Sequence, residues 1–382
     1  MFSKKLSKIF LSLFFLQVFL ATNNILWAYS LPNLIYKDSL GEELIVNFVD
    51  ISEGIIEELR LEKLLGENDI ILSSIQKQAN LCGKQIHIFN GKVEDYKISS
   101  NLQHLAFYSS QEGCLSIIDL KTGALLWKEK MQHPLFQWHP LKQLLTIGEA
   151  NESRTLIYNI DLISKKMFPI IELENTFLHQ IQWSPNGELL GIIKLQGMPE
   201  SQSYSQLEIY NQKGNILDIN NIPDINYMNW SPNNLEIVFS QYGEVYSSSK
   251  VGFFDIPSNT VTYLPQNFEK TINPIYSNDA NSIYFSVIEG FSQKVVSYDI
   301  NKKEFTIFCE EPRYVSDLAL LNNHLLFTFG SFPQIKIIED YKEASVIDGL
   351  SPQVVQNILF YVKNENDNST LLMEYKIDLQ AN

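Results

Sequence analysis

The sequence predicts an all-β protein, a single β-propeller built from four-stranded blades. Three observations predict this fold: short apolar strands recur at similar intervals, a second strand ending near Asn or Asp follows each, and bulky aromatic residues precede recurring turns. One four-stranded sheet cannot bury both of its faces, whereas sheets packed radially around an axis bury one another. An all-β sandwich is the alternative, but it does not require one unit at regular intervals.

The apolar runs of strand type occur eight times along the chain. Their starts are separated by 35, 39, 45, 47, 47, 42 and 33 residues, an interval typical of propeller blades. The runs begin at Ile70, Leu105, Leu144, Leu189, Glu236, Ile283, Leu325 and Ile358.

The second strands end at or near Asx residues, for example at Asn90, Asp119 and Asn159. The side chain of Asn or Asp after a strand accepts hydrogen bonds from the backbone that follows, and so begins the next turn. Most units then carry a third short strand, such as residues 260–264.

A bulky residue ends the inner strand that precedes each of four runs. Trp138, Trp183 and Trp230 are 45 and 47 residues apart, and Tyr276 follows after 46 more. We call these four residues the anchors, and we expect them to pack between neighbouring blades. The turn after Trp183 reads Ser-Pro-Asn-Gly, a sequence rich in turn-forming residues.

The number of blades depends on the first and last units. Eight runs favour eight blades, with seven as the alternative. The last unit ends near Asp378 without room for an outer strand, and we expect residues 43–49 to supply it and close the ring. Residues 55–65 fit either a strand or a helical stripe, and a helix there would favour seven blades.

The first thirty residues have the layout of a secretory signal peptide. Lys4, Lys5 and Lys8 precede an apolar run over residues 9–21, and Ala28 and Ser30 are small residues suited to a cleavage site. A retained anchor is the alternative, but thirteen residues are few for a membrane span. We therefore expect an exported protein, periplasmic or secreted, with no membrane span after cleavage.

The expected organisation is a signal peptide over residues 1–30, an N-terminal segment with the ring-closing strand over 31–54, and the propeller over 55–382. The formal charge is −15, and loss of three leader lysines makes it −18. Such an acidic chain repels phosphate backbones, which argues against a nucleic-acid partner. We expect a monomer whose partner is another protein.

The segment from Trp183 through Asn186, Gly187 and Glu188 resembles the repeat of TolB-like and WD-like propeller proteins. In that repeat an Asp usually stands where Asn186 does, and a Lys where Glu188 does. The resemblance covers about residues 66–378 and implies the fold. TolB itself carries an α/β domain before its propeller, for which the N-terminal segment here is short, so its envelope role is not carried over.

A second, fainter resemblance lies between Ile118 and Trp127. The order of Asp119, Thr122, Gly123 and Trp127 is similar to the docking motif of quinoprotein-type propellers and of the outer-membrane assembly propeller. Those propellers are eight-bladed, but here the motif occurs once.

No catalytic, cofactor-binding or metal-binding constellation is recognisable. The chain has no Gly-x-Ser-x-Gly elbow, no Gly-rich phosphate loop and no HxH or HExxH spacing. We expect no cofactor, although a Ca²⁺ ion held by backbone carbonyls in the channel would leave no sequence signal. The sequence therefore favours a non-enzymatic protein-binding scaffold. The alternative is an enzyme of lactonase, lyase or quinoprotein type with its site in the central channel.

Loops between the second and third strands of each blade fall on one face of the disc. Aromatic residues in these loops are candidates for protein contact, because aromatics concentrate at interfaces. The alternative is that they pack over the ends of the blades. The candidates are Tyr204, Tyr242, Tyr246, Phe291 and Phe332.

Overall fold

The computed structural model describes three N-terminal strands and then most of residues 84–376, as strands joined by turns. Within 84–376 the description omits residues 151–153, 197–203, 220–221, 243–247, 290–291, 312–314, 323, 330–333, 340–341 and 367–368. The predicted signal peptide over residues 1–30 lies outside the described residues.

The N-terminal strands form a separate antiparallel sheet. Its strands are β1 (Leu34–Lys37), β2 (Glu43–Ser52) and β3 (Ile55–Lys63), with β2 in the centre. Leu59 and Leu61 alternate with Arg60 and Glu62, a period of two that suits a strand. Residues 55–63 are therefore a strand rather than a helix, and they belong to this sheet and not to a blade.

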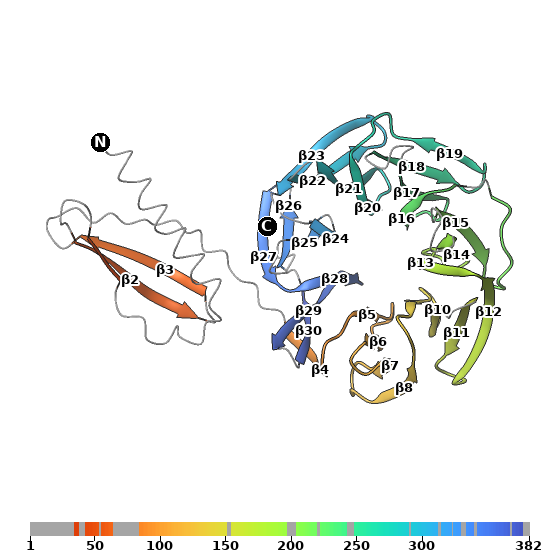
Figure 1. Ribbon diagram of the computed structural model, residues 1–382, viewed down its shortest axis with the longest axis horizontal. Helices are drawn as coiled ribbons and strands as arrows, with labels where there is room; N and C mark the ends of the chain where they lie inside the picture. The colour runs from red at the N-terminus through yellow and green to blue at the C-terminus, as the bar shows by residue number, and fades with distance from the viewer. Residues whose placement is uncertain are drawn as a thin grey trace. The chain divides into compact units, whose positions relative to one another are not determined.

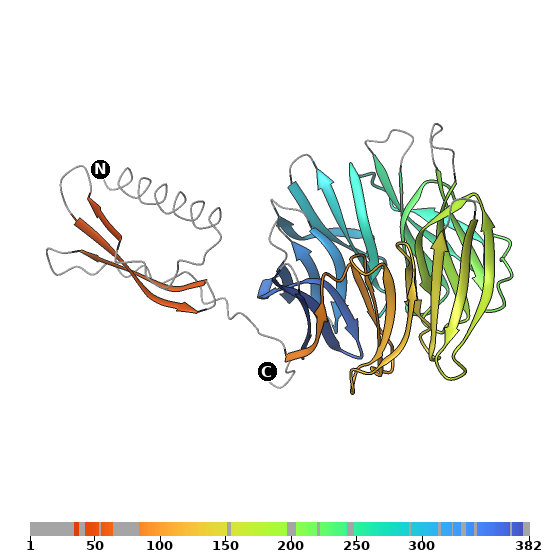
Figure 2. The same ribbon diagram turned by 60° about the horizontal axis from the view of Figure 1, so that its bottom comes forward.

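The described residues between 84 and 376 form a ring of seven sheets around a central axis (Figure 1). Neighbouring strands within each sheet are antiparallel, and Figure 2 shows the ring obliquely. The fold is thus the predicted all-β propeller. From the inner strand outward, blade 1 is β5 (Asp95–Ile98), β6 (His104–Ser109), β7 (Cys114–Asp119) and β8 (Leu125–Lys130). Blade 2 is β9 (Leu135–Trp138), β10 (Leu144–Ala150), β11 (Arg154–Asp161) and β12 (Lys166–Glu174).

The next three blades follow the same order. Blade 3 is β13 (Thr176–Trp183), β14 (Leu189–Gln196) and β15 (Tyr204–Asn211). Blade 4 is β16 (Ile225–Trp230), β17 (Glu236–Tyr242), β18 (Ser249–Asp255) and β19 (Thr260–Tyr263). Blade 5 is β20 (Lys270–Tyr276), β21 (Ser282–Glu289), β22 (Ser292–Asp299) and β23 (Glu304–Glu311).

The last two blades differ in where their outer strand comes from. Blade 6 is β24 (Val315–Leu321), β25 (His324–Phe329), β26 (Gln334–Glu339) and β27 (Lys342–Asp348). Blade 7 combines β28 (Leu350–Val355), β29 (Ile358–Asn366) and β30 (Ser369–Tyr375) with β4 (Lys84–Asn90) from the other end of the propeller sequence.

The prediction of eight blades is wrong, because one predicted unit does not form a blade. Residues 87–90 were expected to be the second strand of a first blade, but β4 pairs with β30 as the outer strand of blade 7, with Phe89 opposite Thr370. The prediction that residues 43–49 close the ring is also wrong. That segment lies in β2, which pairs with β1 and β3.

The four anchors lie between blades. Their exposed fractions are 3% to 5%, and the polar tip of each side chain donates a hydrogen bond to the preceding blade. Buried Trp and Tyr need such partners, because an unpaired polar atom in the core is costly. The bonds are Trp138 Nε1 to Lys97 O (2.8 Å), Trp183 Nε1 to Thr146 Oγ1 (2.8 Å), Trp230 Nε1 to Gln182 O (3.0 Å) and Tyr276 Oη to Glu236 Oε2 (3.3 Å).

A second set of bonds links the third strand of one blade to the inner strand of the next. In blades 2 to 5 the linking residue stands six positions before the Asx that ends its strand. In blade 1 that position is Gly113, which has no side chain. There the Tyr108 hydroxyl of β6 donates to Met131 O (3.3 Å) and accepts from the His133 N–H (3.3 Å), just before β9. The linking side chains of blades 2 to 5 are Thr155 (to Thr176 O), Ser205 (to Ile225 O), Ser249 (to Thr271 Oγ1) and Gln293 (to Val315 O and N). In blade 7 the Thr370 hydroxyl donates to Gly91 O, which lies between β4 and the inner strand of blade 1.

The turn after each anchor is also a repeated structure. Ser184 Oγ donates to Asn186 Oδ1 (2.7 Å) and accepts from the Leu189 N–H (3.0 Å), which fixes the hairpin. Gly187 has φ of +69°, and a Cβ there would lie 2.4 Å from the His139 ring. Glycine is therefore favoured at this position for two reasons, its backbone conformation and the lack of room for a side chain.

His139 replaces the turn serine in blade 2. Its Nδ1 accepts from the backbone N–H groups of Leu141 and Lys142 (3.1 Å each), so Nε2 carries the proton and donates to Gly187 O (3.1 Å) in blade 3. Burial, with a smaller contribution from Lys142, lowers the pKa of His139 to about 4. His139 is thus a neutral bridge between two turns.

We expect Trp183→Ala to lower the free energy of unfolding by about 3–5 kcal/mol, because it empties the interface between blades 2 and 3. Trp183→Phe keeps most of the ring and loses the bond to Thr146, so it should cost about 1–2 kcal/mol. Guanidinium unfolding of both variants is the measurement. An unchanged midpoint for Trp183→Ala would contradict the anchor role.

We expect Phe89→Ala to cost about 3–5 kcal/mol and Ile88→Ala less than about 1 kcal/mol. The two residues are neighbours on β4, but Phe89 is 3% exposed in the core between blades 7 and 1, whereas Ile88 is 51% exposed. Chemical unfolding of the two variants measures how much the outer strand of blade 7 contributes to the free energy of unfolding. Equal costs would show that β4 does not hold this place in solution.

Acid should destabilise the protein in part through His139. Between pH 6.5 and about 4 the unfolded chain holds a proton that folded His139 lacks, so stability falls as the pH falls. From pH 7 to pH 4.5 we expect a loss of roughly 2 kcal/mol from this group. His139→Ser, which restores the residue of the other turns, should lack this contribution. Unfolding of both proteins at the two pH values tests it, and an equal loss in both would contradict it.

Candidate functional site

The aromatic loops predicted as contact sites fall largely outside the described side chains. Tyr246, Phe291 and Phe332 lie in undescribed segments, and Tyr204 is described only as the first residue of β15. Tyr242 ends β17 and is 36% exposed. Contact through these loops stays a prediction.

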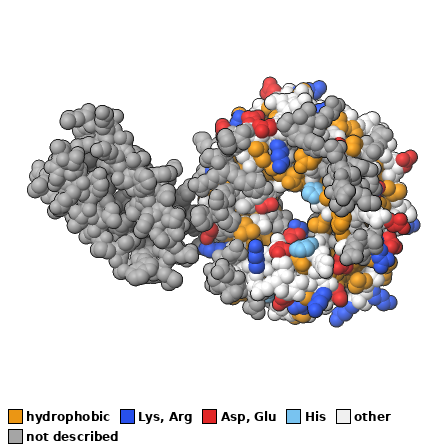
Figure 3. Space-filling view, viewed as in Figure 1, with side chains coloured by type: hydrophobic (Ala, Val, Ile, Leu, Met, Phe, Trp, Pro, Cys, Tyr) orange, Lys and Arg blue, Asp and Glu red, His pale blue; other side chains and the backbone are white. Residues whose placement is uncertain are grey.

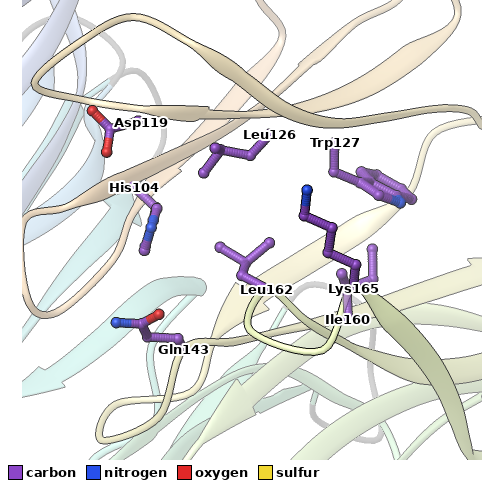
Figure 4. Close-up of a pocket in the computed structure, with 8 residues that line it drawn as sticks. All are labelled: His104, Asp119, Leu126, Trp127, Gln143, Ile160, Leu162 and Lys165. Atoms are coloured by element: carbon purple, nitrogen blue, oxygen red, sulfur yellow. The ribbon is translucent and has the colours of Figure 1, made fainter.

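A pocket of about 210 Å³ lies between blades 1 and 2 on the opposite face (Figure 4). We call this side the turn face, since it carries the turns between first and second strands and between third and fourth strands. The pocket is lined by His104, Asp119, Leu126, Trp127, Gln143, Ile160, Leu162 and Lys165.

Strand pairing explains why these residues converge. His104 begins β6 and Asp119 ends β7, and the two are directly opposite in the antiparallel register. Gln143 precedes β10, and Lys165 lies in the turn between β11 and β12. Residues far apart in sequence therefore meet because each lies where its strand reaches the turn face.

The two sides of the pocket differ in chemistry. Figure 4 shows the groups of Asp119, His104 and Gln143 on one side, and Trp127 and Ile160 on the other. Leu126 and Leu162 lie between them, and the Lys165 side chain extends toward the open centre. The pocket thus offers apolar side chains with hydrogen-bonding groups at one end, and the Lys165 ammonium group lies near Leu126 and Trp127.

The polar end carries one negative charge and a neutral imidazole. Hydrogen bonds from the Thr122 hydroxyl (2.8 Å) and N–H (2.7 Å) lower the pKa of Asp119, which keeps it ionised. Burial lowers the pKa of His104, against a smaller opposing effect of Asp119. His104 is 8% exposed, and its ring stacks on that of Trp138 with 5.8 Å between the ring centroids. Its Nδ1 has no hydrogen-bond partner.

Several exposed apolar side chains line the pocket or stand next to lining residues in sequence or strand register. Leu126 lines the pocket, Ile163 follows the lining residue Leu162, and Leu141 stands two residues before Gln143. Met167 pairs with the lining residue Ile160 across β11 and β12. We call Leu126, Leu141, Ile163 and Met167 the turn-face patch, and their exposed fractions run from 37% to 79%.

The inner strands around the central opening (Figure 3) carry a different feature. In blades 5 to 7 the register of the inner strand shifts by one residue, at Ile272/Ile275, Ser316/Ala319 and Leu350/Gln353. Within these bulges Asn273, Asp317 and Ser351 have φ of 48°, 52° and 53°. Polar residues in left-handed conformations concentrate at functional sites, so the channel is a second candidate location.

Sequence reasoning missed a buried charged group between blades 2 and 3. Lys194 Nζ bonds to Glu208 Oε1, whose other oxygen accepts from the Tyr210 hydroxyl (2.5 Å). The sequence does contain a signal for this buried group, because Lys194 and Glu208 interrupt otherwise apolar strands. The three groups satisfy one another, which fits an internal packing role.

In the described part of the chain, no group of three or more His, Cys, Asp or Glu side chains is arranged to hold a metal ion. The same residues include no helix long and apolar enough to cross a membrane.

Comparison with known proteins identifies the fold and no family. No family model matches the sequence, and no curated protein matches it. Among solved structures, an oligogalacturonate lyase in complex with manganese has a TM-score of 0.58 at 9% identity, covering 76% of this chain and 90% of that one. Resemblance to TolB-like propellers specifically is therefore not shown.

Two further similar structures are parts of peptidases. The acylaminoacyl peptidase of Pyrococcus horikoshii gives a TM-score of 0.56 at 12% identity, over 75% of this chain and 51% of that one. The β-propeller domain of the Trilobed protease from Pyrococcus furiosus gives 0.55 at 13% identity, over 76% and 96%. At such low sequence identities the structural similarity supports one conclusion, that this chain folds as a β-propeller.

Proposed function

We propose that this chain is a non-enzymatic propeller that binds another protein through the turn face of blades 1 and 2. The observation that carries the proposal is the turn-face patch. Four large apolar side chains are exposed at or next to the lining residues of one pocket, and clustered exposed apolar surface marks interaction sites. Protein interfaces combine an apolar core with pockets that take single anchor residues.

The proposal includes export and needs no cofactor. The basic and apolar leader over residues 1–30 supports a periplasmic or envelope location. The aromatic loops on the other face remain candidates for a second contact.

A propeller enzyme with a site in the central channel is the second candidate. The oligogalacturonate lyase supports it, because this fold covers 90% of that enzyme's chain. The bulges at Asn273, Asp317 and Ser351 also support it, since they place polar residues on the inner strands of three consecutive blades. A single carboxylate, Asp317, stands among these three bulge residues, which is little for acid–base chemistry.

We expect the double variant Leu141→Ser, Ile163→Ser to lose at least tenfold in capture of its partner from an envelope fraction, because it removes exposed apolar area without adding charge. Melting should be unchanged, because both side chains are exposed. Ile307→Ser is the matched control, since Ile307 is 56% exposed on the outer strand of blade 5. Equal capture by both variants would contradict the proposed surface. Cleavage of oligogalacturonate by the wild-type chain with manganese, lost in Asp317→Asn, would favour the enzyme instead.

A further inference from the structure

The geometry points to a specific occupant: we infer that the pocket between blades 1 and 2 takes one Trp or Tyr side chain from an acidic segment of a partner protein. This inference rests on the proposed function and adds the chemistry of the partner. Three observations carry it, namely the size of the pocket, its division into apolar and polar ends, and the charge of the turns around it.

The volume fits one large side chain. Pockets for drug-sized ligands measure about 300–1,000 Å³, and this pocket measures about 210 Å³. Its mouth is open to a partner, because Leu126 and Lys165 both line the pocket and are exposed. Single aromatic anchors in pockets of this kind carry much of the binding energy at protein interfaces.

The lining selects an aromatic ring with a polar tip. Trp127, Leu126 and Leu162 offer apolar surface for a ring, while the Asp119 carboxylate and the Gln143 amide at the other end accept hydrogen bonds. A phenol hydroxyl or an indole N–H would donate a hydrogen bond to these acceptors, whereas Phe and Leu have no donor to offer. His104, buried and with Nδ1 unpartnered, adds a further polar group at this end.

The pocket is built before any partner arrives. Trp127 and Leu162 pack against the core shared by blades 1 and 2, and His104 stacks on Trp138. A preformed pocket loses little conformational entropy on binding, which favours affinity from a single anchor.

Charge around the mouth selects an acidic segment. The turns over residues 99–103, 119–124, 139–143 and 161–166 carry four lysines and two aspartates, a formal balance of +2 in a chain of −15. The aspartates, Asp119 and Asp161, are held by hydrogen bonds within their own turns. The lysines are exposed and belong to this edge: Lys121, Lys142, Lys165 and Lys166. A local basic edge on an acidic protein attracts acidic partners and repels basic ones.

The test uses phage-displayed random 12-residue peptides selected on the full chain. We expect selected peptides to contain one Trp or Tyr flanked by Asp or Glu, and their affinity, measured by fluorescence anisotropy, to fall with added salt. Replacing that aromatic residue by Phe should weaken binding several-fold, and replacing it by Ala at least tenfold. Selection of peptides without this pattern, or of none, would overturn the inference.

Two pairs of neighbouring residues provide matched variants. Leu126→Trp adds apolar area but fills the pocket mouth. If an anchor side chain inserts into the pocket, this variant should lose at least tenfold in affinity for the selected peptides. Leu125→Trp, at a 59% exposed neighbour that does not line the pocket, should change affinity less than twofold. Lys165→Glu should weaken binding more than Lys166→Glu, because only Lys165 lines the pocket.

The outcome for Leu126→Trp separates this inference from the proposed function. If Leu126→Trp binds the peptides and the captured partner as tightly as wild type, while Leu141→Ser, Ile163→Ser does not, the patch is an interface without an anchor pocket. If neither set of variants changes binding, both ideas fail. A third outcome is that the wild-type chain binds a free small molecule but no peptide, and that Leu126→Trp loses this binding. That outcome would assign the pocket to a small solute and overturn the inference.

Discussion

The contact between each inner-strand anchor and the preceding blade is the interaction on which the whole ring depends. Trp183 shows why, because its ring fills the space between blades 2 and 3 while Nε1 donates to Thr146 across that interface. A blade cannot form this contact alone, since the acceptor always lies in its neighbour. Blade stability is therefore shared, and each sheet is completed by packing on the next.

The linking side chains hold the opposite end of the four interfaces from blades 2/3 to blades 5/6. The interface between blades 1 and 2 differs, because Gly113 offers no side chain and the Tyr108 hydroxyl of β6 bonds to Met131 O and the His133 N–H instead. The turn of blade 2 is also irregular, with His139 in the place of serine. It is at this interface that the pocket opens. Irregular positions within an otherwise regular repeat are expected at functional sites.

The sequence allowed the blade architecture to be predicted, because the anchors and the Asx turns are local signals. It did not allow the partner of β4 to be predicted. Residues 87–90 look like any second strand, and only long-range pairing with β30 decides that they complete blade 7. The same limit applies to the candidate site. An apolar residue in a turn, such as Leu141 or Ile163, gives no sign from sequence that it stays exposed, whereas aromatic residues in loops drew attention to the other face.

The pairing of His104 with Asp119 shows how a site can arise from the repeat itself. A strand that starts at the turn face and the next strand that ends there bring two polar side chains together at fixed register. Every blade offers the same pair of positions, but a pocket also needs free space beside them. Blades 1 and 2 leave that space, and the buried stacking of His104 on Trp138 keeps it rigid. The anchor that builds the ring thus also shapes the site, which ties binding at this pocket to the integrity of the blade interface.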